Sequence, residues 1–217
     1  MITFKINGAK HKIPTIWENV TYNQYIELLK LPNSLLHYIH LFTSIPIETL
    51  QNSELKNLER IALSLSFLTI PPKPDGKPTL MVGPYPMPAD VTIQSLGQFE
   101  DLRDLAKRLP PNLITLENQL VMAELTLEAC AIYVQKIKHS KYDYSRVKEV
   151  KEELKRYSCM EVTQTGTFFL AKPLNMSTPT TSRFQRVIQR MKKFSQALPG
   201  YQSTLDFLLR SSKPQKP

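Results

Sequence analysis

The sequence is short of glycine, cysteine and uninterrupted apolar runs. Only six of its 217 residues are glycine, and none lies in a GxxxxGK[ST] or GxGxxG pattern, so we expect no backbone cradle for nucleotide phosphates. The two cysteines, Cys130 and Cys159, belong to no CxxC pair, which argues against a zinc site and favours reduced thiols. No apolar run reaches the roughly 18 residues that a membrane-spanning helix needs, so we expect no membrane partner.

Short motifs of common active sites are also missing. GxSxG, HExxH and EF-hand patterns do not occur, and we expect neither an enzyme nor a bound cofactor. The one suggestive metal pair is His37 and His40, whose spacing places both imidazoles on one helical face. A metal site needs at least a third ligand, and neither His11 nor His139 has a matching spacing, so we expect no metal and interpret the pair as packed or exposed histidines.

Three carboxylates, Glu100, Asp101 and Asp104, lie close together in the sequence and raise the question of acid–base catalysis. They fall in the first turns of a predicted helix, where negative charge complements the helix dipole, and basic residues follow them at Arg103, Lys107 and Arg108. An ordinary solvated helix face is therefore the favoured interpretation.

Apolar residues at helical spacing predict a mainly helical chain. The predicted helices cover residues 22–31, 34–43, 52–68, 95–109, 116–137 and 144–157. Two of them begin with the capping-box pattern, at Thr21-x-x-Gln24 and at Ser95-x-x-Gln98. Residues 160–171 are ambiguous between a strand and the start of a helix.

Two segments predict small β-hairpins or loops. Residues 2–13 alternate apolar and polar side chains around Asn7-Gly8, which is typical of a two-residue hairpin turn. Residues 71–88 hold seven of the 17 prolines, so we expect a loop with at most a short edge strand or hairpin, acting as a connector or as a binding arm. The predicted fold class is mainly α with small β-hairpins, within the α+β class.

Positive charge is concentrated in the last fifth of the chain. The net charge is +9, and residues 172–217 contain nine Lys or Arg against the single Asp206. A small polar stretch, residues 175–182, precedes this region and predicts a boundary. We therefore expect a main domain over residues 1–173 and a basic helical appendage with a frayed tail over residues 180–217.

The predicted terminal helix is basic along one face and apolar along another. Its candidate anion-binding or partner-binding residues are Arg183, Arg186, Arg190, Lys192 and Lys193. Nucleic acid phosphates, an acidic protein surface or an anionic membrane surface would each suit such a face. The plain alternative is a helix that docks by its apolar face and leaves the basic flank in solvent.

One stretch occurs twice in loose form. SLGQFEDL at residues 95–102 matches TYNQYIEL at residues 21–28, which indicates either an old duplication or two ordinary helix starts. In the second interpretation Ser95 and Gln98 serve capping, and the apolar Leu96, Phe99 and Leu102 form the buried face of the helix.

Together with the opening hairpin, PTIWENV and the later Phe168-Phe169-Leu170, these two stretches resemble a pattern in small helical proteins from the structural gene modules of tailed bacteriophages. Those proteins often carry LGQF, an acidic residue and Leu. The resemblance covers residues 1–171 by order of features. The first copy departs from it with Asn23 in place of Gly, and the basic terminal segment is not part of the pattern.

The resemblance implies a non-enzymatic structural or assembly protein of a tailed-phage particle, a virion head-to-tail or tail component that works through protein–protein contacts. Its partners would be other phage structural proteins, in an oligomer or multi-subunit assembly, and its location the virion, or the host cytoplasm during assembly. A tail-assembly chaperone absent from the virion is one alternative. A nucleic-acid-binding accessory protein that uses the basic terminal helix is another.

Overall fold

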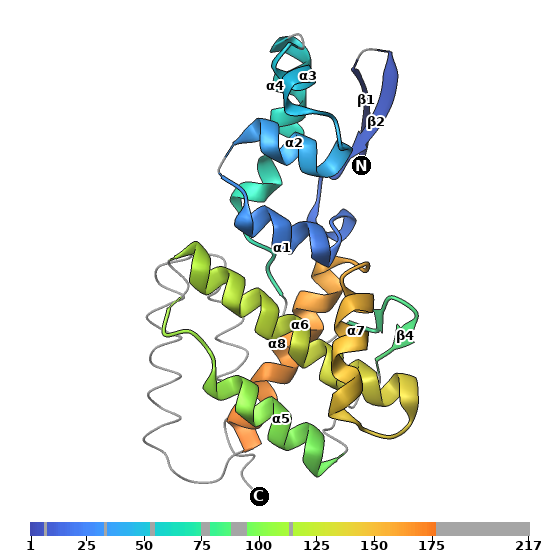
Figure 1. The fold of residues 1–217 in the computed structure, drawn as a ribbon, viewed down its shortest axis with the longest axis vertical. Helices are drawn as coiled ribbons and strands as arrows, with labels where there is room; N and C mark the ends of the chain where they lie inside the picture. Colours follow the sequence, from blue (N-terminus) through green and yellow to red (C-terminus); the bar gives the residue numbers. More distant parts are fainter. Residues whose placement is uncertain are drawn as a thin grey trace, which may run out of the picture.

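The fold has two lobes stacked end to end, each with its own hydrophobic core (Figure 1). A computed structural model describes residues 1–6, 8–32, 34–52, 55–74, 79–87, 95–112 and 115–176. Over these residues the chain is mainly helical and carries two small antiparallel hairpins, which confirms the predicted fold class at that level.

The smaller lobe combines the first hairpin with three helices. Its elements are β1 (Ile2–Ile6), β2 (Ala9–Ile13), α2 (Leu35–Thr43), α3 (Ile47–Gln51) and α4 (Leu55–Ser64), followed by the 3-10 turn η2 (Ser66–Thr69). The strand register pairs Ile2 with Ile13 and Ile6 with Ala9. Gly8 has a φ of 80°, the left-handed conformation that a two-residue hairpin turn requires, so the predicted hairpin is confirmed.

The larger lobe is built around one long helix. Its elements are η1 (Trp17–Asn19), α1 (Tyr22–Lys30), β3 (Met81–Val82), β4 (Tyr85–Pro86), α5 (Leu96–Lys107), α6 (Leu116–His139), η3 (Tyr144–Arg146), α7 (Val147–Leu154) and α8 (Cys159–Met176). Every residue from Leu125 to Gln135 of α6 is buried, because α1, α5, α7 and α8 all pack around it. The rings of Tyr133 on α6 and Phe169 on α8 stack with their centroids 3.8 Å apart.

Most predicted helices are confirmed, one prediction needed correction, and one ambiguous segment is now assigned. The helix expected over residues 52–68 is α4 followed by η2, and the short α3 precedes it directly after Pro46, a residue that suits a helix start. The ambiguous segment at residues 160–171 is helical and lies within α8. Phe169 and Leu170 are buried there by packing of α8 on the rest of the lobe, which local sequence does not show.

The two copies of the repeated stretch cap their helices differently. In the first, Gln24 N–H donates to Thr21 Oγ1 at 3.2 Å and Thr21 N–H donates to Gln24 Oε1 at 3.0 Å, a complete capping box. In the second, Gln98 N–H donates to Ser95 Oγ, but the Gln98 side chain is buried and its Nε2 donates to the carbonyl oxygen of Ile132 on α6. The expectation of burial is wrong for Leu96, which is 72% exposed.

The two cores meet at Phe42 and Phe67, which pack against both. Cys130 and Cys159 are free thiols, as the lack of cysteine pairing predicted, and both are buried. Within the described residues, no helix is long and apolar enough to cross a membrane. The domain division stays a prediction, since residues 180–217 lie outside the described part of the chain.

Candidate functional site

An apolar groove lies where the two lobes join. It has a volume of about 320 Å³ and is bounded by α1, α2, α6, α8 and the extended segment after η2. No described side chain in its lining is charged; apolar and aromatic groups dominate, with four threonines and one glutamine. The lining residues are Trp17, Tyr22, Tyr25, Leu28, Leu29, Tyr38, Leu68, Thr69, Pro71, Pro72, Pro74, Leu116, Gln119, Met122, Ala123, Thr126, Thr163 and Thr167.

The Trp17 side chain holds the proline-containing wall of the groove in position. Its Nε1–H donates to the carbonyl oxygen of Ile70 at 2.8 Å, and its ring packs edge-on against Phe67, with centroids 5.2 Å apart, and against Tyr25 at 5.6 Å. Tryptophan with one polar partner and two aromatic neighbours is well fixed. The segment that carries Pro71, Pro72 and Pro74 is thereby attached to η1.

The Tyr22 side chain joins α1 to α6 beneath the groove. Its hydroxyl donates to the carbonyl oxygen of Ala123 at 2.7 Å, and the residue is fully buried. Burial, with a smaller contribution from Tyr25, holds the pKa of the Tyr22 hydroxyl well above its usual value of 10.0. The group stays neutral and serves as a structural hydrogen-bond donor.

The mouth of the groove is apolar as well. Leu116, in the lining, is 60% exposed, and Ile70, between two lining residues, is 62% exposed. In the wall formed by α8, Thr163 Oγ1 is inaccessible to solvent and has no hydrogen-bond partner among the described residues. The groove therefore offers a mainly apolar surface, and the buried Thr163 hydroxyl is not accessible from it.

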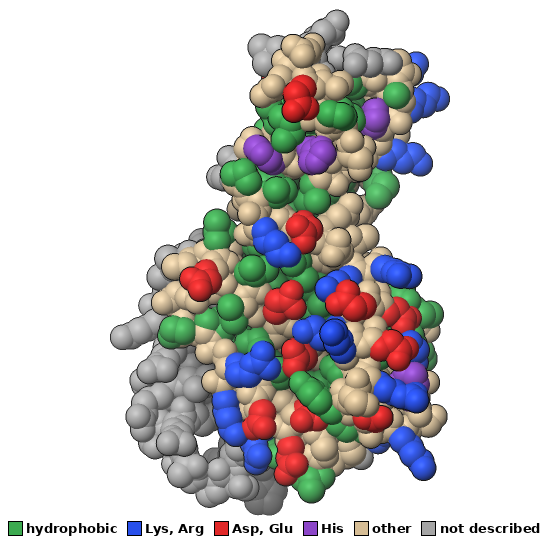
Figure 2. Space-filling view, viewed as in Figure 1, with side chains coloured by type: hydrophobic (Ala, Val, Ile, Leu, Met, Phe, Trp, Pro, Cys, Tyr) green, Lys and Arg blue, Asp and Glu red, His purple; other side chains and the backbone are tan. Residues whose placement is uncertain are grey.

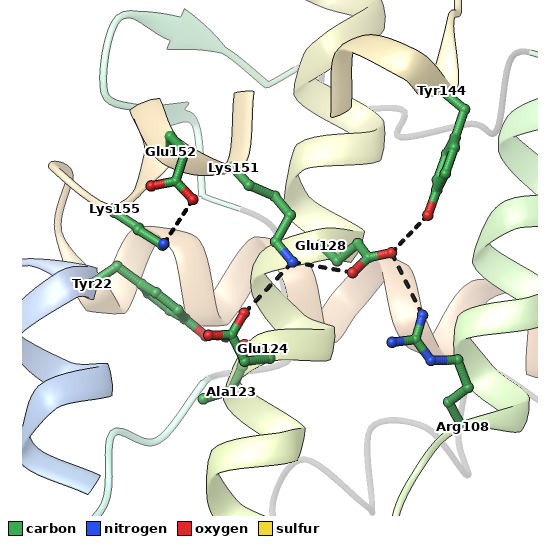
Figure 3. A network of polar contacts seen from close by, with 9 residues as sticks. All are labelled: Tyr22, Arg108, Ala123, Glu124, Glu128, Tyr144, Lys151, Glu152 and Lys155. Carbon is green, nitrogen blue, oxygen red and sulfur yellow. Dashed lines mark hydrogen bonds and ion pairs between the residues drawn. The ribbon is translucent and has the colours of Figure 1, made fainter. Parts of the chain in front are cut away.

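A network of ion pairs lies beside the groove and joins four elements (Figure 3). Glu128 on α6 is its centre: Oε2 accepts from Lys151 Nζ at 3.1 Å, while Oε1 accepts from the Tyr144 hydroxyl at 2.9 Å and lies 3.6 Å from Arg108 NH1. Lys151 also pairs with Glu124 at 3.5 Å. Glu124 and Glu128 both belong to α6, whereas Arg108 lies at the end of α5, Tyr144 in η3 and Lys151 in α7. The network therefore connects the end of α5, η3 and α7 to α6.

A second network fixes the β3–β4 hairpin to the larger lobe. The hydroxyls of Tyr85 and Tyr157 both donate to Glu153, which also pairs with Lys138 at 2.7 Å. Gly83 N–H donates to Glu161 Oε2 at 2.9 Å. Burial and the hydrogen bond to Glu153 raise the pKa of Tyr85 to about 12. The described part of the proline-rich segment is thus attached to the body through this hairpin, while residues 75–78 and 88 lie outside the described chain.

The carboxylates singled out in the sequence do not converge. The Tyr142 hydroxyl donates to Asp101, Asp104 pairs with Lys107 at 2.6 Å, and Glu100 is exposed. Arg108 pairs with Glu128 on α6. The interpretation as a solvated helix face therefore holds for Asp104, but it did not include the tertiary contacts of Asp101 and Arg108.

The two histidines also have separate surroundings. His40 Nδ1 lies 2.7 Å from the carbonyl oxygen of Ile45, and His37 Nδ1 is buried without a partner among the described residues. No three His, Cys, Asp or Glu side chains of the described residues form a cluster that could hold a metal ion. The predicted basic set, Arg183, Arg186, Arg190, Lys192 and Lys193, lies outside the described residues and stays a prediction.

Sequence reasoning missed the groove because its lining comes from separate stretches of the chain. The only local signal was the proline run that starts at Pro71, which forms one wall. The chain matches no protein-family model, no curated protein and no solved structure.

Proposed function

We propose that this chain is a non-enzymatic structural or assembly protein of a tailed-phage particle, and that it holds an uncharged, apolar segment of another particle protein in the groove between its lobes. The resemblance of residues 1–171 to proteins of phage structural modules supports the phage assignment. The observation that carries the binding mode is the uncharged lining of the 320 Å³ groove, which continues into exposed Leu116 at its mouth.

A polypeptide segment suits this groove better than a small molecule. The volume of about 320 Å³ is at the small end of ligand pockets. Leu116 in the lining and Ile70, between two lining residues in the sequence, are both more than half exposed, so an occupant that also covers these two side chains is larger than the cavity. An apolar helix or extended segment would fill the cavity with one or two side chains and cover the rim with its neighbours.

Proteomics of purified particles tests the assignment to a particle and separates its two versions. A virion component is present in a fixed ratio to the major structural proteins, whereas an assembly chaperone is absent from particles yet required for their production. If deletion of the gene left both particle yield and infectivity unchanged, neither version would hold.

The groove itself is tested by a matched pair of exposed leucines. Leu116→Glu introduces a charge at the mouth, and Leu63→Glu introduces the same charge on α4, away from the groove, where the leucine is 77% exposed. Both variants should fold, since both leucines are largely in solvent. We expect Leu116→Glu to lower particle yield at least tenfold in a complementation assay and Leu63→Glu to leave it unchanged. Equal yields would refute the groove as the binding site.

A further inference from the structure

The outward face of the β1–β2 hairpin is a patch of lysines. Side chains alternate along the two strands, and Thr3, Lys5, Lys10 and Lys12 are the exposed ones opposite the buried apolar set. The register brings Lys5 directly opposite Lys10 and Thr3 directly opposite Lys12. Like charges directly opposite each other destabilise a strand pair, so the stability of the hairpin does not account for this arrangement.

The hairpin lysines differ from the lysines of the helices in their ion pairing among the described residues. Lys5, Lys10 and Lys12 form no ion pair with any described residue, whereas Lys30, Lys107 and Lys155 of the helices each pair with a carboxylate within 2.8 Å. In Figure 2, blue side chains project from the edge of the upper lobe, on the side where Figure 1 shows the hairpin. Red and blue side chains are interspersed over the lower lobe. Within the part of the chain that the structure describes, the hairpin therefore presents positive charge that no ion pair offsets.

We propose that this face, formed by Thr3, Lys5, Lys10 and Lys12, binds the phosphate backbone of double-stranded DNA without sequence preference. Lysine ammonium groups on flexible stems contact phosphates as point charges and do not read base edges in a fixed geometry. The proposal is independent of the groove and of the assembly role.

The composition of the face favours duplex DNA over other polyanions. Protein interfaces rely on aromatic and apolar anchors in a buried centre, and the exposed outward residues of the two strands are one threonine and three lysines. Single-stranded nucleic acid is held by stacking on aromatic side chains, which this face does not offer among its described residues. Duplex DNA carries one negative charge per about 1.7 Å of helix axis, so its backbone places several phosphates within reach of three neighbouring lysines.

The spacing of the three lysines along and across the strands lets their flexible side chains reach several phosphates at once. Lys10 and Lys12 are two residues apart on one strand, about 7 Å, and Lys5 lies about 5 Å across from Lys10. Each neutralised phosphate contributes about 0.9 to the slope of log affinity against log salt. Three contacts therefore predict a contribution of nearly three from this hairpin.

Fluorescence polarisation with the full chain and a labelled duplex of mixed sequence tests the proposal over a salt series. The variant is Lys5→Gln, Lys10→Gln and Lys12→Gln combined, and the control is Lys30→Gln, Lys107→Gln and Lys155→Gln combined, which removes the same charge from ion-paired lysines. We expect the hairpin variant to bind at least tenfold more weakly at low salt, with the slope reduced by two to three. The control variant should lose less than threefold, and the hairpin Lys→Arg triple should bind like the unmodified chain.

Several outcomes would overturn the proposal. Equal losses in the two glutamine triples would mean that only net charge matters. A hairpin variant with unchanged slope would mean that these lysines do not touch phosphate. Competition by phosphatidylserine vesicles or by poly-glutamate that exceeds competition by unlabelled duplex, and depends on the hairpin lysines, would assign the face to a membrane or to an acidic protein. The hairpin variant should melt no lower than the unmodified chain, because it removes a repulsion.

Discussion

Gly166 on α8 lies against the backbone of Thr126 on α6, so closely that a Cβ atom at residue 166 would be 2.1 Å from the Thr126 carbonyl oxygen. A backbone atom in the middle of a buried helix cannot move aside as a side chain can. Gly166→Ala should therefore lower the free energy of unfolding by about 2–3 kcal/mol, even though alanine favours a helix. Urea denaturation measures this difference.

Gly97 supplies the control for that substitution. It is also helical, but a Cβ atom there would meet only side-chain atoms, those of the partly buried Tyr142 ring at 3.1 Å, and this ring needs to move by only a few tenths of an ångström. Gly97→Ala should change the free energy of unfolding by less than about 1 kcal/mol in either direction. If both substitutions were equally mild, the close crossing of α6 and α8 would be wrong.

Glu128 and Asp104 test how much burial adds to an ion pair. Both pair with a lysine, but Glu128 accepts hydrogen bonds from two elements and its side chain is 11% exposed, whereas that of Asp104 is 61% exposed. Glu128→Gln leaves Lys151 and Arg108 with reduced compensation, and we expect a loss of about 1–3 kcal/mol in stability. Asp104→Asn should cost less than about 0.5 kcal/mol. Equal losses by thermal or chemical denaturation would contradict this account.

Local sequence was sufficient for most of the helices and for the first hairpin, but it did not show α3 or assign residues 160–171. Thr21 and Gln24 form the capping box that their spacing predicts, and Gly8 adopts the positive φ that its turn requires. These features depend on residues a few positions apart. At Ser95 and Gln98 the predicted cap is also present, but the local pattern did not show that the Gln98 side chain also donates to the carbonyl oxygen of Ile132, 34 positions away.

The groove and the two lobes could not be predicted in this way. Tyr22 contacts Ala123 across 101 positions, and Trp17 contacts Ile70 across 53. Such pairs depend on how helices cross, and no periodicity encodes which helices become neighbours. The lysine face of the hairpin is an intermediate case. The alternation of polar and apolar residues was visible in the sequence, but the proposal of a phosphate-binding face required the strand register and the absence of ion pairs with described residues.

The acid stability of the protein should depend on Glu153. Burial alone would raise the pKa of this carboxyl, but the hydrogen bonds from Lys138, Tyr85 and Tyr157 outweigh burial and leave the pKa below its usual value of 4.5. A carboxyl with a lowered pKa in the folded state contributes stability above its unfolded pKa, and that stability is lost as the pH falls through the folded pKa.

In the Glu153→Gln variant, the free energy of unfolding should therefore fall less steeply as the pH drops below about 4.5. The reason is that up to about one proton fewer is taken up when this variant unfolds. Denaturation midpoints measured from pH 7 to pH 2 give this slope. Glu59→Gln, at an exposed residue of α4 with no ion pair to a described residue, serves as the control. A slope that changes equally in both variants would refute the role of Glu153.

The basic residues of the terminal segment are predicted, from the sequence alone, to bind an anionic partner. If Arg183, Arg186, Arg190, Lys192 and Lys193 contact nucleic acid, replacing all five by alanine should reduce the salt slope of binding by about one for each lost phosphate contact. Combined with the hairpin glutamine triple, the two reductions should add, because separate contacts release counterions independently. Binding that survives the five alanines at full affinity and slope would leave the hairpin as the nucleic acid contact and assign this segment to another partner.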